Sequence, residues 1–69
     1  MNIVGSNVRR IRESKNWTQD QLAAKCNLIQ WNISRGTVAK IESKVRRITD
    51  LEIKLLVQVL DVEIDELFK

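Results

Sequence analysis

The sequence predicts an all-α fold, a compact bundle of about five short helices. Two features of composition and one of pattern support this prediction. The 69 residues include no proline and only two glycines, and apolar residues recur at helical spacing over long stretches. No stretch alternates as a strand would. A chain of this length forms one domain at most, so residues 1–69 are assigned to a single domain.

The first helix is expected from about Ser6 to Lys15. Val8 and Ile11 share one apolar stripe, and Arg12 lies at the edge of that stripe. An arginine in this position is usually solvated, unless a buried carboxylate elsewhere in the fold needs a partner.

A clear start signal marks the second helix. Thr18 can cap the amide of Gln21, Gln21 can reach back to Thr18, and Trp17 can pack on Leu22. The helix therefore starts near residue 19, and its apolar stripe consists of Leu22, Ala23, Cys26 and Ile29. The chain has no histidine to activate a thiol, so Cys26 is interpreted as a core residue rather than a nucleophile.

The third helix has its own start signal and two different faces. Ser34 is the cap, so this helix starts near residue 35. At about 100° per residue, Val38, Ile41 and Glu42 fall on one side. The opposite side contains no carboxylate and consists of Gly36, Thr37, Lys40, Ser43 and Lys44. A small, polar and cationic face suits an approach to a polyanion.

The two stretches that form these helices resemble a known family. They are Thr18-Gln19-Asp20-Gln21-Leu22-Ala23 and Ile33-Ser34-Arg35-Gly36-Thr37-Val38-Ala39-Lys40-Ile41-Glu42. Both resemble the helix-turn-helix of the lambda-repressor and Cro family of DNA-binding domains, with the motif at about residues 18–43. In that family the second helix of the motif lies in the DNA major groove and the first crosses the backbone.

The resemblance and the outward face together give the candidate DNA contacts. Arg35 can offer a two-pronged contact to guanine, and Lys40 lies further along the same face; both match base-reading positions of the family. The expected base-reading residues are Arg35, Gly36, Thr37 and Lys40. The expected backbone contacts are Gln19, Ser34, Lys44, Arg46 and Arg47. The alternatives are that Gln19 only starts its helix and that the basic run, Lys44, Arg46 and Arg47, is a solvated loop.

A structural ion pair is expected between the first and third helices. Glu42 falls on the buried side of its helix and needs a cation if it stays ionised. Arg12 is the candidate partner, and the family resemblance implies the same pairing.

The corner between the two motif helices departs from the family. Residues 27–32 include about five extra residues, enough for a further helical turn and a looser corner. The usual glycine is absent, so Asn32 is expected to adopt the left-handed conformation that ends the helix. Trp31 is expected to pack over the join. Lys44 stands where the family commonly has glycine, so the third helix is expected to end differently here.

The C-terminal helices are expected over about residues 50–68. Apolar residues of the longer one spread over roughly 240° of the helical wheel, wider than the stripe of roughly 100° that one packing surface needs. A second partner surface follows from this, and homodimerisation is the hypothesis. The expected interface residues are Leu51, Leu55, Val59 and Phe68.

Charge divides the chain into two parts. Residues 1–47 hold ten Lys or Arg against three acids, a balance of +7, and residues 48–69 have a balance of −4. This division favours a polyanion-binding half, with ordinary surface solvation as the alternative. No signal peptide or membrane span is expected, and a single cysteine cannot form an internal disulfide, so the protein is expected in the cytoplasm.

The predicted function is a sequence-specific regulator of transcription that binds double-stranded DNA, a repressor acting as a dimer on a two-fold operator. The alternative is an antitoxin or another adaptor that binds a protein partner through the same domain. An enzyme is not expected, because the chain offers no catalytic constellation, metal-ligand cluster or cofactor motif.

Overall fold

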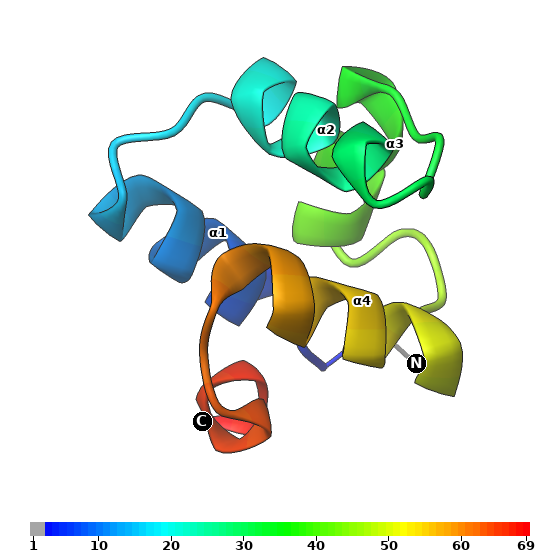
Figure 1. Cartoon of the computed structure of the whole chain (residues 1–69). Coiled ribbons are helices and arrows are strands. Elements are labelled where there is room, and N and C mark those ends of the chain that lie inside the picture. The colour runs from blue at the N-terminus through cyan, green and yellow to red at the C-terminus, as the bar shows by residue number, and fades with distance from the viewer. Residues whose placement is uncertain (1–2) are drawn as a thin grey trace.

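Four α-helices and one final 3-10 helix make up the computed structural model, which describes residues 3–69. The elements are α1 (Gly5–Ser14), α2 (Gln19–Leu28), α3 (Arg35–Glu42), α4 (Asp50–Leu60) and the 3-10 helix η1 (Ile64–Phe68). Figure 1 shows α2 and α3 together at one end of the molecule, with α4 and η1 at the other. The all-helical prediction is confirmed.

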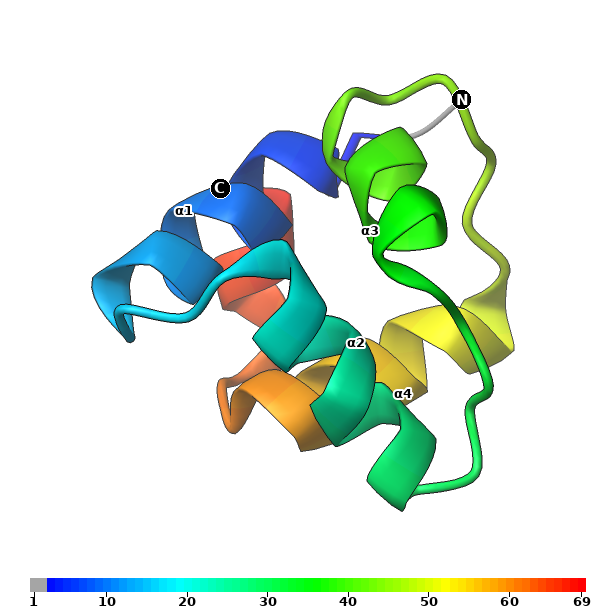
Figure 2. The same ribbon diagram turned by 90° about the horizontal axis from the view of Figure 1, so that it is seen from above.

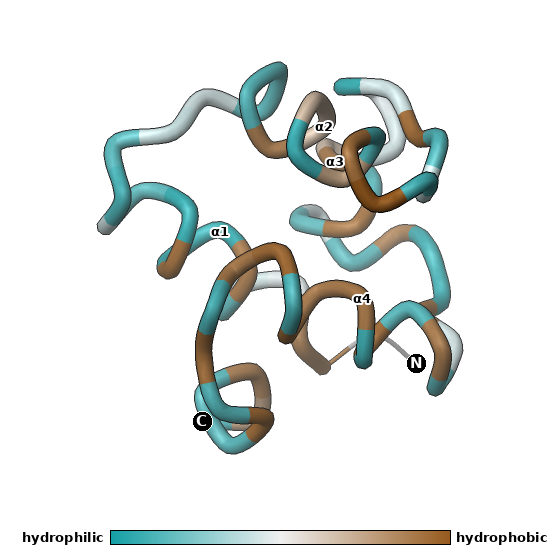
Figure 3. Tube along the Cα trace, viewed as in Figure 1, coloured by the Kyte–Doolittle hydropathy of each residue, from teal (hydrophilic) through white to brown (hydrophobic). Residues whose placement is uncertain are grey.

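One apolar core joins all five elements. Each helix contributes at least one fully enclosed side chain, and Figure 3 shows hydrophobic residues recurring along every helix. The core consists of Val4, Val8, Ile11, Leu22, Ala23, Cys26, Val38, Ile41, Leu56, Leu60 and Leu67. Trp17, Trp31 and Ile33 are half-buried and pack against it.

Side-chain caps fix where the helices start. Thr18 and Thr49 each accept a hydrogen bond from the backbone three residues on and begin α2 and α4 with complete capping boxes. The hydroxyl of Ser34 accepts from the amide of Thr37 at 3.2 Å and caps α3. These bonds satisfy amides that a helix start leaves without partners, so the expected starts near residues 19 and 35 are confirmed.

Helix ends depend on residues other than glycine. Asn16, Gln30, Lys44 and Asp61 have positive φ values of 61°, 66°, 67° and 55°. The left-handed turn after α2 therefore falls on Gln30, and the prediction that Asn32 would adopt it is wrong. After α3, Lys44 takes the conformation that glycine adopts at little steric cost, so this helix still ends in a left-handed turn.

Lys44→Gly is expected to raise the free energy of unfolding by about 0.5–1 kcal/mol. A side chain in the left-handed region costs about 1–2 kcal/mol, and the greater freedom of glycine in the unfolded chain offsets part of the gain. Urea denaturation would measure the change. Lys44→Ala is the control, because it removes the same charge and keeps a Cβ; an equal gain from alanine would show that charge, and not the backbone, is responsible.

The extra residues between α2 and α3 form an extended connection with its own hydrogen bonds. The Asn27 side chain donates to the carbonyl oxygens of Ala23 at 2.7 Å and Ile33 at 2.9 Å, and the Trp31 amide donates to that of Cys26 at 3.0 Å. Ile29, expected on the helical stripe, lies just beyond the end of α2 and is half-buried. Figure 2 shows this connection looping out from the end of α2 before α3 begins.

The C-terminal segment is held on α1. The buried Asn7 amide donates to the carbonyl oxygen of Leu67 at 2.9 Å and to that of Lys69 at 3.0 Å. Arg10 donates to the carbonyl oxygen of Glu66 at 3.1 Å, and Leu67 is fully buried. The end of the chain is therefore part of the core and covers one side of α4.

Candidate nucleic-acid interface

The two sides of α3 differ as the sequence predicts. Val38 and Ile41 are 1% and 2% exposed and fasten the helix to the core. The outer face of α3, which we define as Arg35, Gly36, Thr37 and Lys40, has three exposed residues and the half-buried Thr37. The nearest side-chain atom to a Cβ built on Gly36 is the Ser34 hydroxyl at 3.5 Å, so the helix surface is open there. A cationic helix surface thus faces solvent.

A buried ion pair holds the inner side of α3. Arg12 of α1 donates to Glu42 through Nε at 2.7 Å and through Nη2 at 3.1 Å. The remaining terminal nitrogen of Arg12 donates to the Trp17 carbonyl oxygen at 2.6 Å. The hydrogen bond to Glu42 raises the pKa of the Arg12 guanidinium against the opposing effect of burial. The pair that the sequence suggests is present, and it joins α1 to α3 and to the start of α2.

Gln19 belongs to the same network. Its side-chain amide donates to Glu42 Oε1 at 3.1 Å, and the side chain is half-buried. The amide that was expected to meet a phosphate therefore has a partner within the protein. The N-terminus of α2 can still attract an anion through the positive end of the helix dipole.

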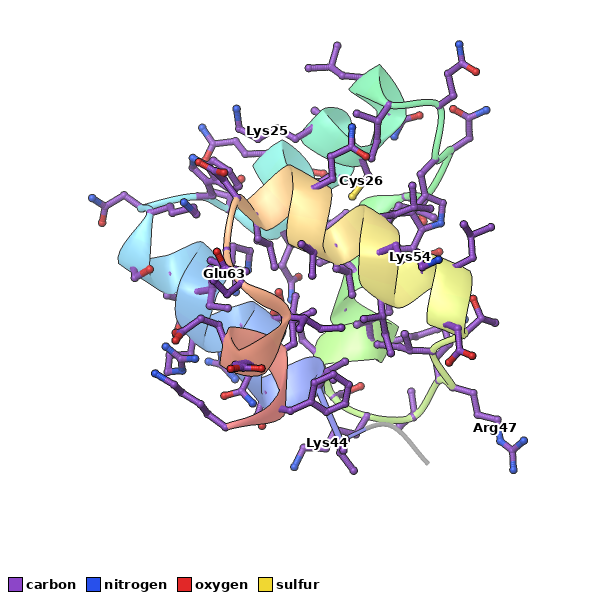
Figure 4. The ribbon with its side chains drawn as sticks, turned by 60° about the horizontal axis from the view of Figure 1, so that its bottom comes forward. Lys25, Cys26, Lys44, Arg47, Lys54 and Glu63 are labelled. Carbon is purple, nitrogen blue, oxygen red and sulfur yellow. The ribbon has the colours of Figure 1, made fainter. Side chains whose placement is uncertain are left out.

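Two cations follow α3 on an exposed loop. Lys44 and Arg47 are exposed, and Figure 4 shows both side chains extending away from the body of the molecule. Neither side chain has an ion-pair partner within residues 3–69. Both are free to contact an anion.

Arg46 behaves differently from its neighbours. Its two terminal nitrogens donate to Glu52 of α4, at 3.0 Å and 2.6 Å, and one also donates to the Arg47 carbonyl oxygen at 3.0 Å. The hydrogen bond from Arg46 lowers the pKa of Glu52. The Arg46 guanidinium is thus engaged within the protein and fixes the loop to the start of α4, while its contact with phosphate stays a prediction.

The expected dimer residues differ in exposure. Leu51 is 66% exposed and Phe68 is 46% exposed. Leu55 and Val59 are half-buried, with Val59 packed against the core. Leu51 lies in the first turn of α4 and Phe68 at the end of η1, so the two most exposed of these residues come from different elements.

The Cys26 thiol is fully buried, and burial raises its pKa to about 11, which suits a neutral core residue. Within residues 3–69, no group of three or more His, Cys, Asp or Glu side chains could hold a metal ion. No helix of the same residues is both long and apolar enough to cross a membrane.

Comparison with known proteins identifies the family to which this arrangement of helices belongs. The helix-turn-helix family model matches residues 8–67, which is most of the chain. Searches of the curated proteins and of the solved structures found no significant match. The match includes α2, α3 and their extended connection, as well as α4 and most of η1.

Proposed function

The chain belongs to the helix-turn-helix family of the lambda-repressor and Cro type, a family of DNA-binding regulators, and on that premise we propose a specific role. We propose that the protein is a sequence-specific transcriptional repressor that binds double-stranded DNA as a dimer in the cytoplasm. The observation that carries the proposal is the exposed, acid-free outer face of α3, fastened from behind by Val38, Ile41 and Glu42.

In this proposal α3 enters the major groove and reads base edges. Arg35 stands in the first turn, where a guanidinium can donate to guanine O6 and N7 at once. Lys40 reaches the groove further along the helix. Gly36 allows the backbone to approach closely, and Thr37 can contact a thymine methyl or a phosphate. A helix of eight residues is short, so only these few side chains determine the sequence that is read.

Backbone contacts orient α3 in the groove. Lys44 and Arg47, exposed on the following loop, pair with phosphates on one side of α3. The start of α2 and the Ser34 hydroxyl meet phosphates on the other side. Arg46 and Gln19 act indirectly, since one holds the loop and the other holds Glu42.

Dimerisation matches the protein to a two-fold operator. We assign the interface to Leu51, Leu55, Val59 and Phe68, with Leu51 and Phe68 as the residues that lose most exposed apolar surface. Two copies would then place their α3 helices in major grooves about one helical turn apart. Occlusion of polymerase is a sufficient mechanism of repression, and the proposal includes no catalytic step or cofactor.

The same exposed Leu51 also favours the second candidate, an antitoxin or adaptor that binds an unrelated protein through α4. The two functions separate in a binding experiment with defined components. A repressor alone sediments as a dimer on its operator with no further protein. An adaptor requires a partner whose binding is lost on Leu51→Lys while DNA binding by the same variant persists.

Selection from a random duplex pool tests the main proposal. Repeated rounds of binding and amplification are expected to yield one motif, arranged as two inverted half-sites. A single motif without symmetry would contradict the dimer and leave base reading intact. Recovery of unenriched sequence would contradict sequence-specific binding altogether.

Arg47→Ala is expected to weaken binding to all duplexes alike and to reduce the slope of log affinity against log salt by about one unit. The reason is that binding releases about one counterion for each phosphate contact, so a protein with one contact fewer releases about one counterion fewer. Fluorescence anisotropy at several salt concentrations measures the slope. Lys69→Ala is the control, because it removes one charge at the C-terminus, far from α3 in Figure 1; an equal change there would show that only net charge matters.

A further inference from the structure

A hollow on the outer side of α2 is not used by the proposed DNA contacts. We call it the Trp17 hollow; it has a volume of about 350 Å³ and is lined by Trp17, Gln21, Ala24, Lys25 and Leu28. Leu28 is 81% exposed, the highest value among the large apolar side chains of residues 3–69. Because α2 buries Leu22, Ala23 and Cys26 on its other side, this helix has apolar residues on two faces, and only one of them is covered.

Two ammonium groups flank the indole in this hollow. Lys25 Nζ lies 4.6 Å from the centre of the Trp17 ring, and Lys15 Nζ lies 5.4 Å from it. Both distances are within the range of cation–π attraction. Neither lysine has a carboxylate partner in the described part of the chain. The Trp17 hollow is therefore an apolar site with positive charge at its edge, which matches an apolar side chain between acids.

The chain has a segment with this chemistry at its other end. Glu63, Ile64 and Asp65 are consecutive and exposed, and Ile64 is 50% exposed. Glu63 and Asp65 make no ion pair among residues 3–69, whereas the adjacent Glu66 pairs with Lys69 at 2.7 Å. Figure 4 shows Lys25 and Glu63 on the same side of the molecule, away from Arg47. Each copy carries one Trp17 hollow and one acidic segment, so two copies can offer each other both halves of a contact.

We propose that two copies of this chain associate through these surfaces, with Ile64 of each seated in the Trp17 hollow of the other. Glu63 and Asp65 then face Lys15 and Lys25, and Leu28 loses its exposure. Isolated surface ion pairs contribute little, so the buried apolar contact is a necessary part of the association. This contact is separate from the α4 interface of the proposed repressor and would link neighbouring dimers on DNA, where their effective concentration is high.

Charge exchange in the absence of DNA tests the contact. The parent protein carries Leu51→Lys, which removes the proposed α4 contact. One variant adds Lys15→Glu and Lys25→Glu; the other adds Glu63→Lys and Asp65→Lys. Sedimentation equilibrium from about 10 μM to about 1 mM gives each association constant. The parent is expected to dimerise. Each variant alone is expected to have an association constant at least about tenfold lower, because like charges now meet. The equimolar mixture of the two variants is expected to have an association constant within about threefold of that of the parent.

A matched control reverses two charges elsewhere. Lys44→Glu with Arg47→Glu in the same parent is expected to leave the association constant unchanged. A parent that stays monomeric over this range, a mixture no stronger than the separate variants, or an equal loss in the control would each overturn the proposal. All measurements are made without DNA, so a failure here is distinct from a failure of the proposed repressor function.

Discussion

Glu42→Ala is expected to lower the free energy of unfolding by about 3–5 kcal/mol, the largest effect of any single change considered. The Glu42 side chain is 3% exposed, and that of Arg12 is 9% exposed. Alanine would leave a buried guanidinium with one remaining acceptor, the carbonyl oxygen of Trp17. The Gln19 amide would lose its acceptor as well. Urea denaturation followed by circular dichroism measures the loss.

A double-mutant cycle separates the contribution of the ion pair from the contribution of the packing of the two side chains. Arg12→Met with Glu42→Leu replaces both partners by apolar side chains of similar length and is expected to recover most of the loss, because no buried charge is left alone. Either single variant of the cycle should be much less stable than the double variant. Single variants that lose less than about 1 kcal/mol would contradict the view that the pair is buried in solution.

Arg35→Ala is expected to cost about 1–3 kcal/mol of binding free energy on the selected operator and to relax the preference at one base pair of each half-site. The reason is that alanine removes a two-pronged donor that distinguishes guanine from other bases. Random duplex DNA should lose far less affinity, because only the charge of the side chain acts there. Anisotropy on operator and random duplexes at one salt concentration compares the two losses.

Two further variants sharpen this comparison. Arg35→Lys keeps the charge without the planar fork and is expected to fall between wild type and alanine on the operator. Arg47→Ala, a phosphate contact in the proposal, should weaken both duplexes alike. Equal losses on operator and random DNA for Arg35→Ala would remove the assignment of base reading to this residue.

The helix starts could be predicted from sequence because their signals are local. Thr18, Ser34 and Thr49 bind amides only three residues away, so neither the fold nor the solvent enters the argument. The end of α2, by contrast, was mispredicted. Asparagine is a residue type that often adopts the left-handed conformation, but here the turn falls on Gln30 and not on Asn32. The amides of Ile29 and Gln30 donate to the carbonyl oxygens of Cys26 and Asn27 and close the last turn.

The basic run shows where sequence reasoning about the site stops. Lys44, Arg46 and Arg47 look alike as a string of cations, and nothing in their order distinguishes them. The loop brings the Arg46 guanidinium to Glu52, six residues away, and leaves the other two in solvent. Glu52 also completes the capping box with Thr49, and its second role as the partner of Arg46 depends on the path of the loop.

The separation of charge along the molecule has a kinetic consequence. The helix α3, which contains Arg35 and Lys40, lies toward one end of the fold, and η1, which contains Asp65 and Glu66, lies toward the other (Figure 1). Such a molecule has an electric dipole, and the field near a polyanion exerts a torque that turns the positive end inward before contact. Encounters would then begin already oriented, and their rate, more than the lifetime of the final complex, would fall as ionic strength rises.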